Sequence, residues 1–424
     1  MRILMFGWEF PPDISGGLGT ACHELTRTLT RHGNTIVFVV PHSRAPGHKS
    51  HVELIDASRV SLPYPPSVEE FFEALDLKPV DSILRPYLND AEYQTVLNAA
   101  ERAAAEHPGA SSIIAPQTLY GATLMAEVAR YSEIGETLAL DQEFDIIHAH
   151  DWMTFLAGIR AKRATGKPLV VHIHAVEHDR SGGAINRSIF EIEKIGMEAA
   201  DHVIAVSHYT RNLILEQYGI NPDKVSVVHN AVSRRNVGKV YHTPRTRTKK
   251  TVLFLGRITS QKGPDYFVEA AARVLEKTQD VTFVMAGAGD MLPRMIERIG
   301  QLHIGRHFHF TGFLSGHDVE RMYAMSDLYV MPSVSDPFGL SPLEAMIYDV
   351  PVILSKSAGV NEVMPHALTV DFWDVEDIAG KILAILQYPA LSRELIRNTR
   401  KSLQSIRWEV AAERIQLIYN KLCM

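Results

Sequence analysis

Residues 2–40 read RILMFGWEFPPDISGGLGTACHELTRTLTRHGNTIVFVV, and this stretch decides the fold class. An apolar run at 2–6 is followed by a helical pattern at about 21–31 and by a second apolar run at 35–40. Alternation of nearly continuous apolar strands with helices is typical of βαβ units in a parallel sheet that is covered on both faces. The N-terminal segment therefore predicts an α/β fold.

The same rhythm recurs along the chain and then restarts, which predicts two sheets. Further strands of the first sheet are expected at 145–148, 169–173 and 202–205, and strands of a second sheet at 251–255, 281–285, 307–311, 328–331 and 351–354. Since 424 residues are too many for one core, two domains are expected. We place them at 1–232 and 251–405, followed by a helix at 406–424 that returns to the first domain.

Two segments interrupt this rhythm. Residues from about 50 to 140 contain Pro-rich loops and two helical stretches, near 92–106 and 120–140, and we interpret them as an insertion that caps the first domain. Residues 233–250 carry seven Lys or Arg residues and no acidic residue. This composition is typical of a solvated linker and is also compatible with an arm that binds phosphate or glucan; we favour the linker.

Composition narrows the class of function. Hydrophobic residues make up 46% and charged residues 22% of the chain, as in an ordinary globular enzyme. The net charge of −6 argues against nucleic acid as the main partner. Only Cys22 and Cys423 occur, so neither a disulfide framework nor a cysteine zinc site is expected. The N-terminus reads as a strand and no apolar run is long enough to span a membrane, so we expect a cytoplasmic protein.

Ligands of open α/β sheets bind beyond the carboxyl ends of the strands, and four motifs of this chain fall there. The first is Asp13-Ile14-Ser15-Gly16-Gly17-Leu18-Gly19-Thr20. Its adjacent glycines allow a ligand to approach the backbone at a helix N-terminus. The motif has neither the glycine spacing of a dinucleotide fingerprint nor the Lys of a Walker loop.

The second motif is a pair of His-x-His strand ends. His148 and His150 end one strand, and His172 and His174 end the next, with His150 and Asp151 expected at an exposed tip. Such a cluster can hold a metal ion, or it can hydrogen-bond sugar hydroxyls and a pyrophosphate. We favour the second interpretation because dedicated metal sites show tighter ligand motifs. His148 and His172, one step back in their strands, are expected to be hydrogen-bonded core histidines.

The third motif, at 255–263, carries Arg257 and Lys262, a pair of cations suited to a diphosphate leaving group. The fourth is Asp336-Pro337-Phe338-Gly339-Leu340-Ser341-Pro342-Leu343-Glu344, in which one acid precedes a helix and the other lies inside it. The N–H groups of that helix N-terminus favour a phosphate or a polar sugar. Glu344 can accept hydrogen bonds from a ribose diol, and Asp336 can offset positive charge at a reacting carbon.

Taken in order, the four motifs resemble those of the two-lobed, metal-independent retaining glycosyltransferases that include glycogen and starch synthases and sucrose-phosphate synthases. The resemblance covers nearly the whole chain. It implies the GT-B fold, in which two Rossmann-like lobes face each other across a cleft. It also implies a nucleotide-sugar donor such as ADP- or UDP-glucose, an α-glucan or other saccharide acceptor, no cofactor and no metal.

The resemblance further implies roles for individual residues. Catalytic roles would fall to His150, Arg257, Lys262 and Asp336. Donor contacts would come from Gly16, Gly17, Arg257, Lys262, Gly287, Phe338, Gly339, Leu340, Ser341 and Glu344. Acceptor or sugar contacts would come from Glu9, Asp151, His174 and Tyr120. Ser207 to Arg211 and Asn230 match positions that line the cleft and are equally compatible with structural roles.

Within that family, Trp8-Glu9-Phe10-Pro11-Pro12 and His148-Ala149-His150-Asp151-Trp152 are most similar to the glycogen synthase branch. Two positions depart from the pattern. Asp336 stands where the family usually has Glu, and Ser15 stands where the bacterial ADP-glucose-dependent synthases usually have Lys. The donor sugar's position and the nucleobase therefore stay open.

The expected activity is transfer of glucose from a nucleoside diphosphate glucose to an α-1,4-glucan, with retention. Its alternatives are another transferase of the same fold, making sucrose phosphate, a disaccharide or a cell-wall glycoside; a nucleotide-sugar epimerase or hydrolase; and a non-catalytic sugar-binding regulator.

Overall fold

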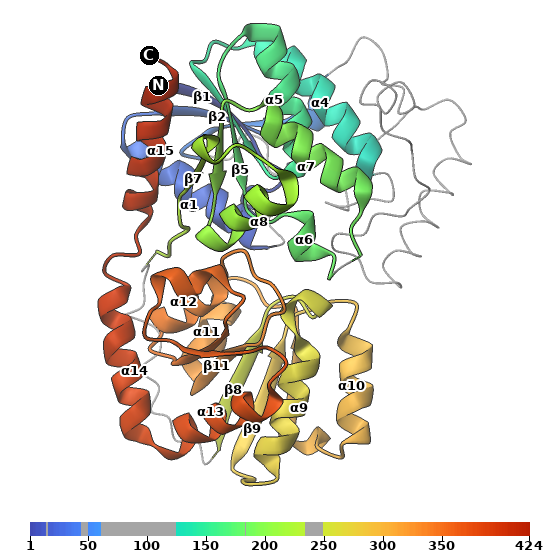
Figure 1. Cartoon of the computed structure of the whole chain (residues 1–424), viewed down its shortest axis with the longest axis vertical. Coiled ribbons are helices and arrows are strands. Elements are labelled where there is room, and N and C mark those ends of the chain that lie inside the picture. Colours follow the sequence, from blue (N-terminus) through green and yellow to red (C-terminus); the bar gives the residue numbers. More distant parts are fainter. Residues whose placement is uncertain (14–15, 44–49, 61–123, 183, 234–248) are drawn as a thin grey trace, which may run out of the picture.

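The structure, a computed structural model, describes residues 1–13, 16–43, 50–60, 124–182, 184–233 and 249–424. They form two lobes that face each other, each built on one parallel sheet (Figure 1). The expected α/β fold with two lobes is confirmed. Tyr120, the helical stretch near 92–106 and most of the basic linker lie outside the described residues.

The N-terminal lobe contains a seven-stranded sheet in the order β3-β2-β1-β4-β5-β6-β7. Its strands are β1 (Arg2–Phe6), β2 (Thr35–Val40), β3 (Glu53–Asp56), β4 (Ile146–His150), β5 (Leu169–Ile173), β6 (His202–Ala205) and β7 (Val225–Val227). Its helices are α1 (Gly17–Arg31), α4 (Leu124–Asp141), α5 (Trp152–Thr165), α6 (Glu177–Arg180), α7 (Arg187–Ala199) and α8 (His208–Tyr218), with 3₁₀ turns η1 (Ala57–Arg59) and η2 (Pro222–Lys224).

The C-terminal lobe contains a six-stranded sheet in the order β10-β9-β8-β11-β12-β13. Its strands are β8 (Lys250–Leu255), β9 (Val281–Ala286), β10 (Phe308–Gly312), β11 (Leu328–Met331), β12 (Val352–Ser355) and β13 (Leu368–Val370). Its helices are α9 (Pro264–Leu275), α10 (Leu292–Gln301), α11 (His317–Met325), α12 (Leu340–Ile347), α13 (Val375–Gln387) and α14 (Pro389–Ser402), with 3₁₀ turns η3 (Ser260–Lys262), η4 (Gly305–His307) and η5 (Gly359–Val363).

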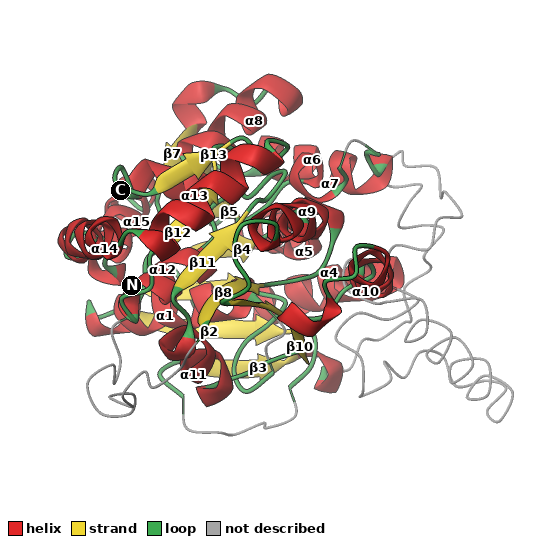
Figure 2. Ribbon diagram, turned by 90° about the horizontal axis from the view of Figure 1, so that it is seen from below, coloured by secondary structure: helices red, strands yellow, loops and turns green. Residues whose placement is uncertain are grey.

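Both faces of each sheet are buried under helices (Figure 2). Along β1, Ile3 and Met5 belong to one hydrophobic cluster and Leu4 and Phe6 to another, because successive side chains of a strand point to opposite faces. This arrangement explains why the strands read as continuous apolar runs rather than as alternating ones.

The C-terminal helix α15 (Trp408–Leu422) returns to the N-terminal lobe, as expected, and lies beside α1 (Figure 1). Trp408, Ile415 and Tyr419 are at most 4% exposed, and burial of each side chain contributes about 2 kcal/mol. Asn34 Nδ2 also donates to Gln416 Oε1 at 2.6 Å. The last helix is therefore an integral part of the first lobe's core.

Two described elements within the expected insertion, β3 and α4, are part of the N-terminal lobe itself. β3 pairs in parallel with β2, and α4 packs along α5. Both elements thus belong to the layers of the N-terminal lobe. Among the helices that the structure describes, none has the length and apolar character needed to cross a membrane.

Candidate functional site

Each sheet has a point where the strand order reverses, between β1 and β4 in the first lobe and between β8 and β11 in the second. Doubly wound sheets bind ligands outside the carboxyl ends of the strands at such a point. The glycine motif lies between β1 and α1, the pair His148 and His150 ends β4, and the motifs at 255–263 and 336–344 lie at the ends of β8 and β11. The strand order therefore places these motifs at the two switch points, with His172 and His174 at the end of the neighbouring strand β5.

The loops after β8 and β11 are in direct contact. Gly263 has φ +66°, and a Cβ there would lie 2.0 Å from the carbonyl oxygen of Pro332, so the close approach requires glycine. This approach brings Lys262 Nζ within 2.5 Å of Asp336 Oδ2, with 20% and 5% of the two side chains exposed. Two of the expected catalytic residues thus form a nearly buried ion pair.

The other expected cation, Arg257, lies earlier in the β8 loop. Its Nη2 donates to Gln261 Oε1 at 3.1 Å. Gly287, at the end of β9, has φ +141°, and a Cβ there would lie 1.9 Å from the carbonyl oxygen of Gly256. Backbone packing alone therefore requires Gly287, whatever its role toward a ligand.

The loop after β11 enters α12 as the sequence predicts, with one acid on each side of the helix start. Gly339, at φ +89°, caps the helix, and Asp336, which is 3% exposed, is hydrogen-bonded through its backbone to the 357–359 segment. Inside the helix, Glu344 Oε2 accepts from Tyr323 OH at 3.0 Å. Burial raises the pKa of Glu344, and this hydrogen bond partly offsets the effect. The N-terminal end of α12 is built by the expected donor residues Phe338, Gly339, Leu340 and Ser341.

The glycine turn of the first lobe faces this helix end. Helix α1 begins at Gly17, with Gly16 as its N-cap, which is earlier than the expected start near residue 21. A Cβ at Gly17 would lie 3.6 Å from Leu340 Cδ1, and a Cβ at Gly16 would meet no heavy atom of the described residues within 4 Å. The N-terminal ends of α1 and α12 therefore face each other across the two lobes.

Four imidazoles lie side by side at the ends of β4 and β5, and we call His148, His150, His172 and His174 the histidine ladder. The rings stack in pairs along each strand, with centroids 4.3 Å and 4.4 Å apart, and His150 lies opposite His172. The expectation of an exposed tip is wrong. β4 continues to His150, which is fully buried, and Asp151 is 7% exposed. Only His174 is partly exposed.

Hydrogen bonding in the ladder is incomplete. His148 Nδ1 contacts Tyr419 OH, and His150 Nδ1 lies 3.0 Å from His174 Nε2. Neither ring nitrogen of His172 has a hydrogen-bond partner in the described part of the chain. The prediction of a hydrogen-bonded core histidine thus holds for His148, whereas His172 is in the core without such bonds.

Burial, followed by the neighbouring imidazoles, lowers the pKa of His148, His150 and His172 well below the ordinary value, and burial also lowers that of His174. The ladder is therefore neutral at physiological pH. Ring nitrogens of His148, His150 and His172 lie within 4.8 Å of one another, as do those of His150 and His174 with Cys22 Sγ. This geometry keeps the metal alternative open.

Asp151 holds the turn that follows the ladder. It has φ +59°, and its Oδ1 accepts from the backbone N–H of His174 at 2.7 Å and of Ala175 at 3.4 Å. Glu9, another expected sugar contact, is 3% exposed. The pKa of Cys22 is raised by burial of its thiol, next by the charge of Asp151 and then by the charge of Glu9. Both acids are therefore buried inside the first lobe.

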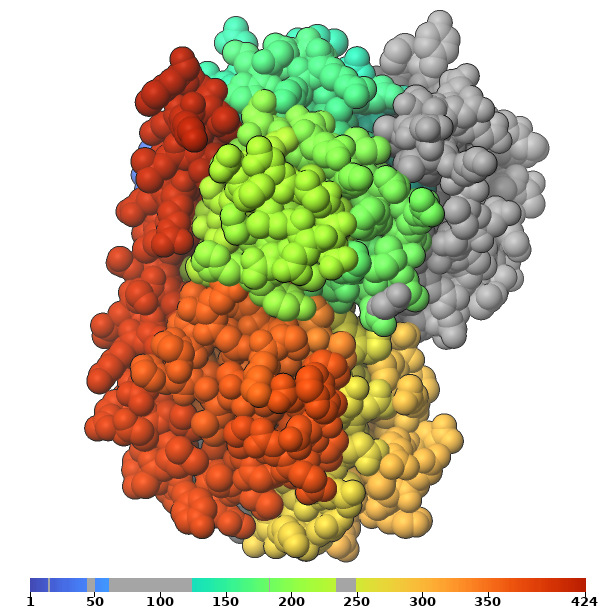
Figure 3. All heavy atoms as spheres, viewed as in Figure 1, coloured from blue at the N-terminus to red at the C-terminus, as the bar shows by residue number. Residues whose placement is uncertain are grey.

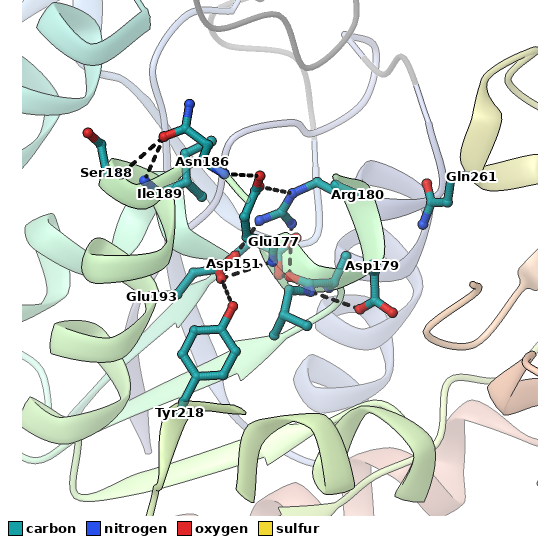
Figure 4. A network of polar contacts seen from close by, with 12 residues as sticks. Asp151, Glu177, Asp179, Arg180, Asn186, Ser188, Ile189, Glu193, Tyr218 and Gln261 are labelled. Carbon is teal, nitrogen blue, oxygen red and sulfur yellow. Dashed lines mark hydrogen bonds and ion pairs between the residues drawn. The ribbon is translucent and has the colours of Figure 1, made fainter. Parts of the chain in front are cut away.

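A buried polar network holds α6 and the residues on either side of it, 174–182 and 184–186 (Figure 4). Arg180 donates to Ala175 O at 2.9 Å and to the Glu193 carboxylate, which also accepts from Tyr218 OH. Burial raises the pKa of Glu193 to about 7. The sequence pattern did not reveal this network, because its members are separated along the chain and only the short acidic-basic run at 177–180 signals it.

The network presents Asp179 to the other lobe. Asp179 Oδ1 accepts from Ser335 Oγ at 2.6 Å, and Ser335 Oγ also lies 2.9 Å from Tyr209 OH. Burial raises the pKa of Asp179 to about 6. Nearby, Ser207 caps α8 by accepting from Thr210 N–H at 3.0 Å and donates to Pro337 O of the second lobe at 2.5 Å. The loop after β11 is thus held by both lobes, and it contacts the segments after β5, β6 and β8.

Two family models match the chain: Glycosyltransferase Family 4 over residues 128–235 and glycosyl transferases group 1 over residues 242–402. Together with the two facing parallel sheets, they define a glycosyltransferase of the GT-B type. More specifically, the chain contains a family 4 glycosyltransferase domain followed by a group 1 glycosyl transferase domain.

Similar proteins span almost the whole chain. An uncharacterised glycosyltransferase of Methanocaldococcus jannaschii is 26% identical, over 99% of this chain and 98% of its own. A glycogen synthase of Mycobacterium tuberculosis is 25% identical, over 99% and 94%. Among solved structures, a sucrose-phosphate synthase from Thermosynechococcus elongatus has a TM-score of 0.72 at 18% identity, over 99% and 98%. The last comparison concerns the fold alone.

Proposed function

We propose that this chain transfers glucose from a nucleoside diphosphate glucose, ADP- or UDP-glucose, to the end of an α-1,4-glucan. The observation that carries the proposal is the contact between the loops after β8 and β11, where Lys262 meets Asp336 at the switch point of the second sheet. The likeness to a glycogen synthase over the whole chain supports the choice of substrates.

In this proposal the second lobe binds the donor. The guanidinium group of Arg257 donates hydrogen bonds to two oxygens of the diphosphate, and the ammonium group of Lys262 leaves Asp336 and binds a phosphate oxygen. Both positive charges then stabilise the leaving group as its bond to glucose breaks. Glu344, held by Tyr323, accepts hydrogen bonds from the ribose. The facing N-terminal ends of α1 and α12 supply N–H groups from both lobes.

The first lobe would hold the transferred glucose. His150 is fully buried and contacts His174, which alone in the ladder is partly exposed. We therefore assign the direct sugar contact to His174, with His150 fixing the orientation of its ring. Neutral imidazoles suit this role because they hydrogen-bond hydroxyls without adding charge.

Retention of configuration would follow a front-face displacement without a metal. The bond between the anomeric carbon and the diphosphate breaks, the acceptor oxygen bonds to the same face of that carbon, and a phosphate oxygen takes the acceptor proton. Asp336 would offset positive charge at the anomeric carbon. Chelation by EDTA should then leave the rate undiminished. We also propose that the reaction takes place in the cytoplasm, where nucleotide sugars and glucan would meet it.

The test is a thermal-shift panel of ADP-, UDP- and GDP-sugars, followed by product analysis of the best binder with glycogen. Release of nucleoside diphosphate together with elongation of the glucan, with the new linkage in the α configuration, supports the proposal. Absence of release with every donor refutes it.

A sucrose phosphate-forming transferase is the second candidate, because the similar sucrose-phosphate synthase covers the whole fold. Acceptor profiling with glycogen and fructose 6-phosphate separates the two. A non-catalytic regulator is tested by Asp336→Glu, which restores the residue expected for the family: a catalyst should change its rate, whereas a regulator should stay inert.

A further inference from the structure

The carboxylate of Glu362, in the second lobe, is hydrogen-bonded by three groups of the first lobe. It lies in η5, and its carboxylate accepts from the backbone N–H of His208 and of Tyr209, each at 2.8 Å, at the start of α8. His229 Nε2 lies 2.7 Å from the same carboxylate. Figure 1 shows α8 at the side of the first lobe that faces the second.

A second imidazole completes a set of three ligands. The His208 and His229 rings have centroids 5.9 Å apart and are tilted by 60° to each other. One ring nitrogen of each and one oxygen of Glu362 all lie within 4.8 Å of one another. His208 and Glu362 are exposed and His229 is partly exposed, so an ion from solution reaches all three.

We propose that His208, His229 and Glu362 form a binding site for a zinc-class divalent ion that joins the two lobes. Two imidazole nitrogens and one carboxylate oxygen are a ligand set that Zn²⁺ binds, with water as the fourth ligand. Mg²⁺ and Ca²⁺ prefer oxygen ligands and fit this set poorly. The ion replaces the hydrogen bond between His229 and Glu362, whose atoms are already close enough to be neighbouring ligands.

The site exists only while the lobes are together, because its imidazoles come from one lobe and its carboxylate from the other. An ion that binds this arrangement alone shifts the population toward it. Zinc at this site therefore holds the lobes closed, and since a transferase of this type must open to release its product, it slows turnover. The ion is regulatory and takes no part in the chemistry.

The test uses the metal-free full chain. Co²⁺ is titrated while its visible absorption is followed, Zn²⁺ binding is measured by calorimetry, and the radius of gyration is measured by small-angle scattering. The variants are His208→Ala, His229→Ala and Glu362→Gln. The matched control is His317→Ala, which removes an exposed histidine that lies 3.1 Å from Glu320 on α11.

We expect the unaltered chain and His317→Ala to bind one ion and to contract on binding. Each of the three variants should bind on the order of 10-fold or more weakly, a loss of about 1.4 kcal/mol, and should not contract. Full affinity in His229→Ala, or no saturable binding by the unaltered chain, overturns the proposal. Binding that survives all three variants and is lost in Cys22→Ser would place the ion in the histidine ladder and also overturn it. Binding without contraction refutes the joining of the lobes.

Discussion

Replacing Lys262 with Met removes the charge that neutralises Asp336. With 5% of its side chain exposed, Asp336 would become a nearly buried carboxylate without its ion-pair partner. Breaking a buried pair in this way costs about 3–5 kcal/mol. Since Lys262 is 20% exposed, we expect a loss near the lower figure, about 3 kcal/mol of unfolding free energy. The double variant Lys262→Met, Asp336→Asn leaves no unpaired charge and should recover most of this loss.

Binding of a nucleoside diphosphate should follow a different pattern. In the unaltered chain Asp336 competes for the Lys262 ammonium group and repels the incoming diphosphate. Asp336→Asn should therefore bind ADP or UDP more tightly. Lys262→Met should bind roughly 10- to 100-fold more weakly, which is the value of one charge-assisted hydrogen bond. The double variant should stay weak although its stability recovers.

Urea unfolding and calorimetry with ADP and UDP, applied to the four proteins, separate the two effects. Lys250→Met is the control, because Lys250 pairs with Asp327 at 3.2 Å but is 56% exposed. Its loss should cost no more than about 1 kcal/mol and leave nucleotide binding unchanged. If the double variant regains nucleotide affinity together with stability, Lys262 serves only as the partner of Asp336 and the assigned diphosphate contact is refuted.

Three further predictions concern single sites. The ladder histidines are neutral in the folded chain, so the unfolded chain binds more protons and the unfolding free energy should fall as pH drops below about 6.5. In urea titrations at several pH values, His172→Phe should reduce the slope of unfolding free energy against pH. An unchanged slope would contradict the assignment of neutral, buried histidines. Gly287→Ala should lower the free energy of unfolding by more than about 1 kcal/mol, because the added Cβ overlaps a neighbouring carbonyl oxygen. Gly16→Ala should keep the Tm of the unaltered chain, and equal Tm values for the two variants would count against this account. Tyr323→Phe removes the hydrogen bond that lowers the pKa of Glu344, so loss of donor affinity on acidification should begin at a higher pH in calorimetry, and an identical pH profile would exclude this role.

The strands and the position of the motifs were predictable because both depend on local patterns. Buried parallel strands are continuous apolar runs, and β11 was expected at its observed bounds. The loop-helix motif was predictable for the same reason, since Gly339 and Pro342 mark where a helix starts after a turn. Such signals lie within a few residues of each other in the chain.

Burial of the ladder and the contacts between lobes were not predictable in this way. His150 is covered by Phe38 from β2 and lies against the ring of His148, which in turn contacts Tyr419 of the last helix. Asp179 and Ser335 are separated by 156 positions. A periodic pattern shows which face of a strand a side chain occupies, but it does not show which distant element covers that face.

The joint between the lobes combines two kinds of contact, and the difference suggests how they move. The first kind is polar and includes the cross-lobe hydrogen bonds from Ser207 to Pro337 and from Ser335 to Asp179. Hydrogen bonds of this kind exchange with water at little net cost, so they can open and re-form. By contrast, α15 is buried against α1 while α14 covers the second lobe, and the C-terminal segment runs along one side of both (Figure 3). We therefore expect the lobes to open at the cleft and to pivot about residues 403–407, which join these two helices.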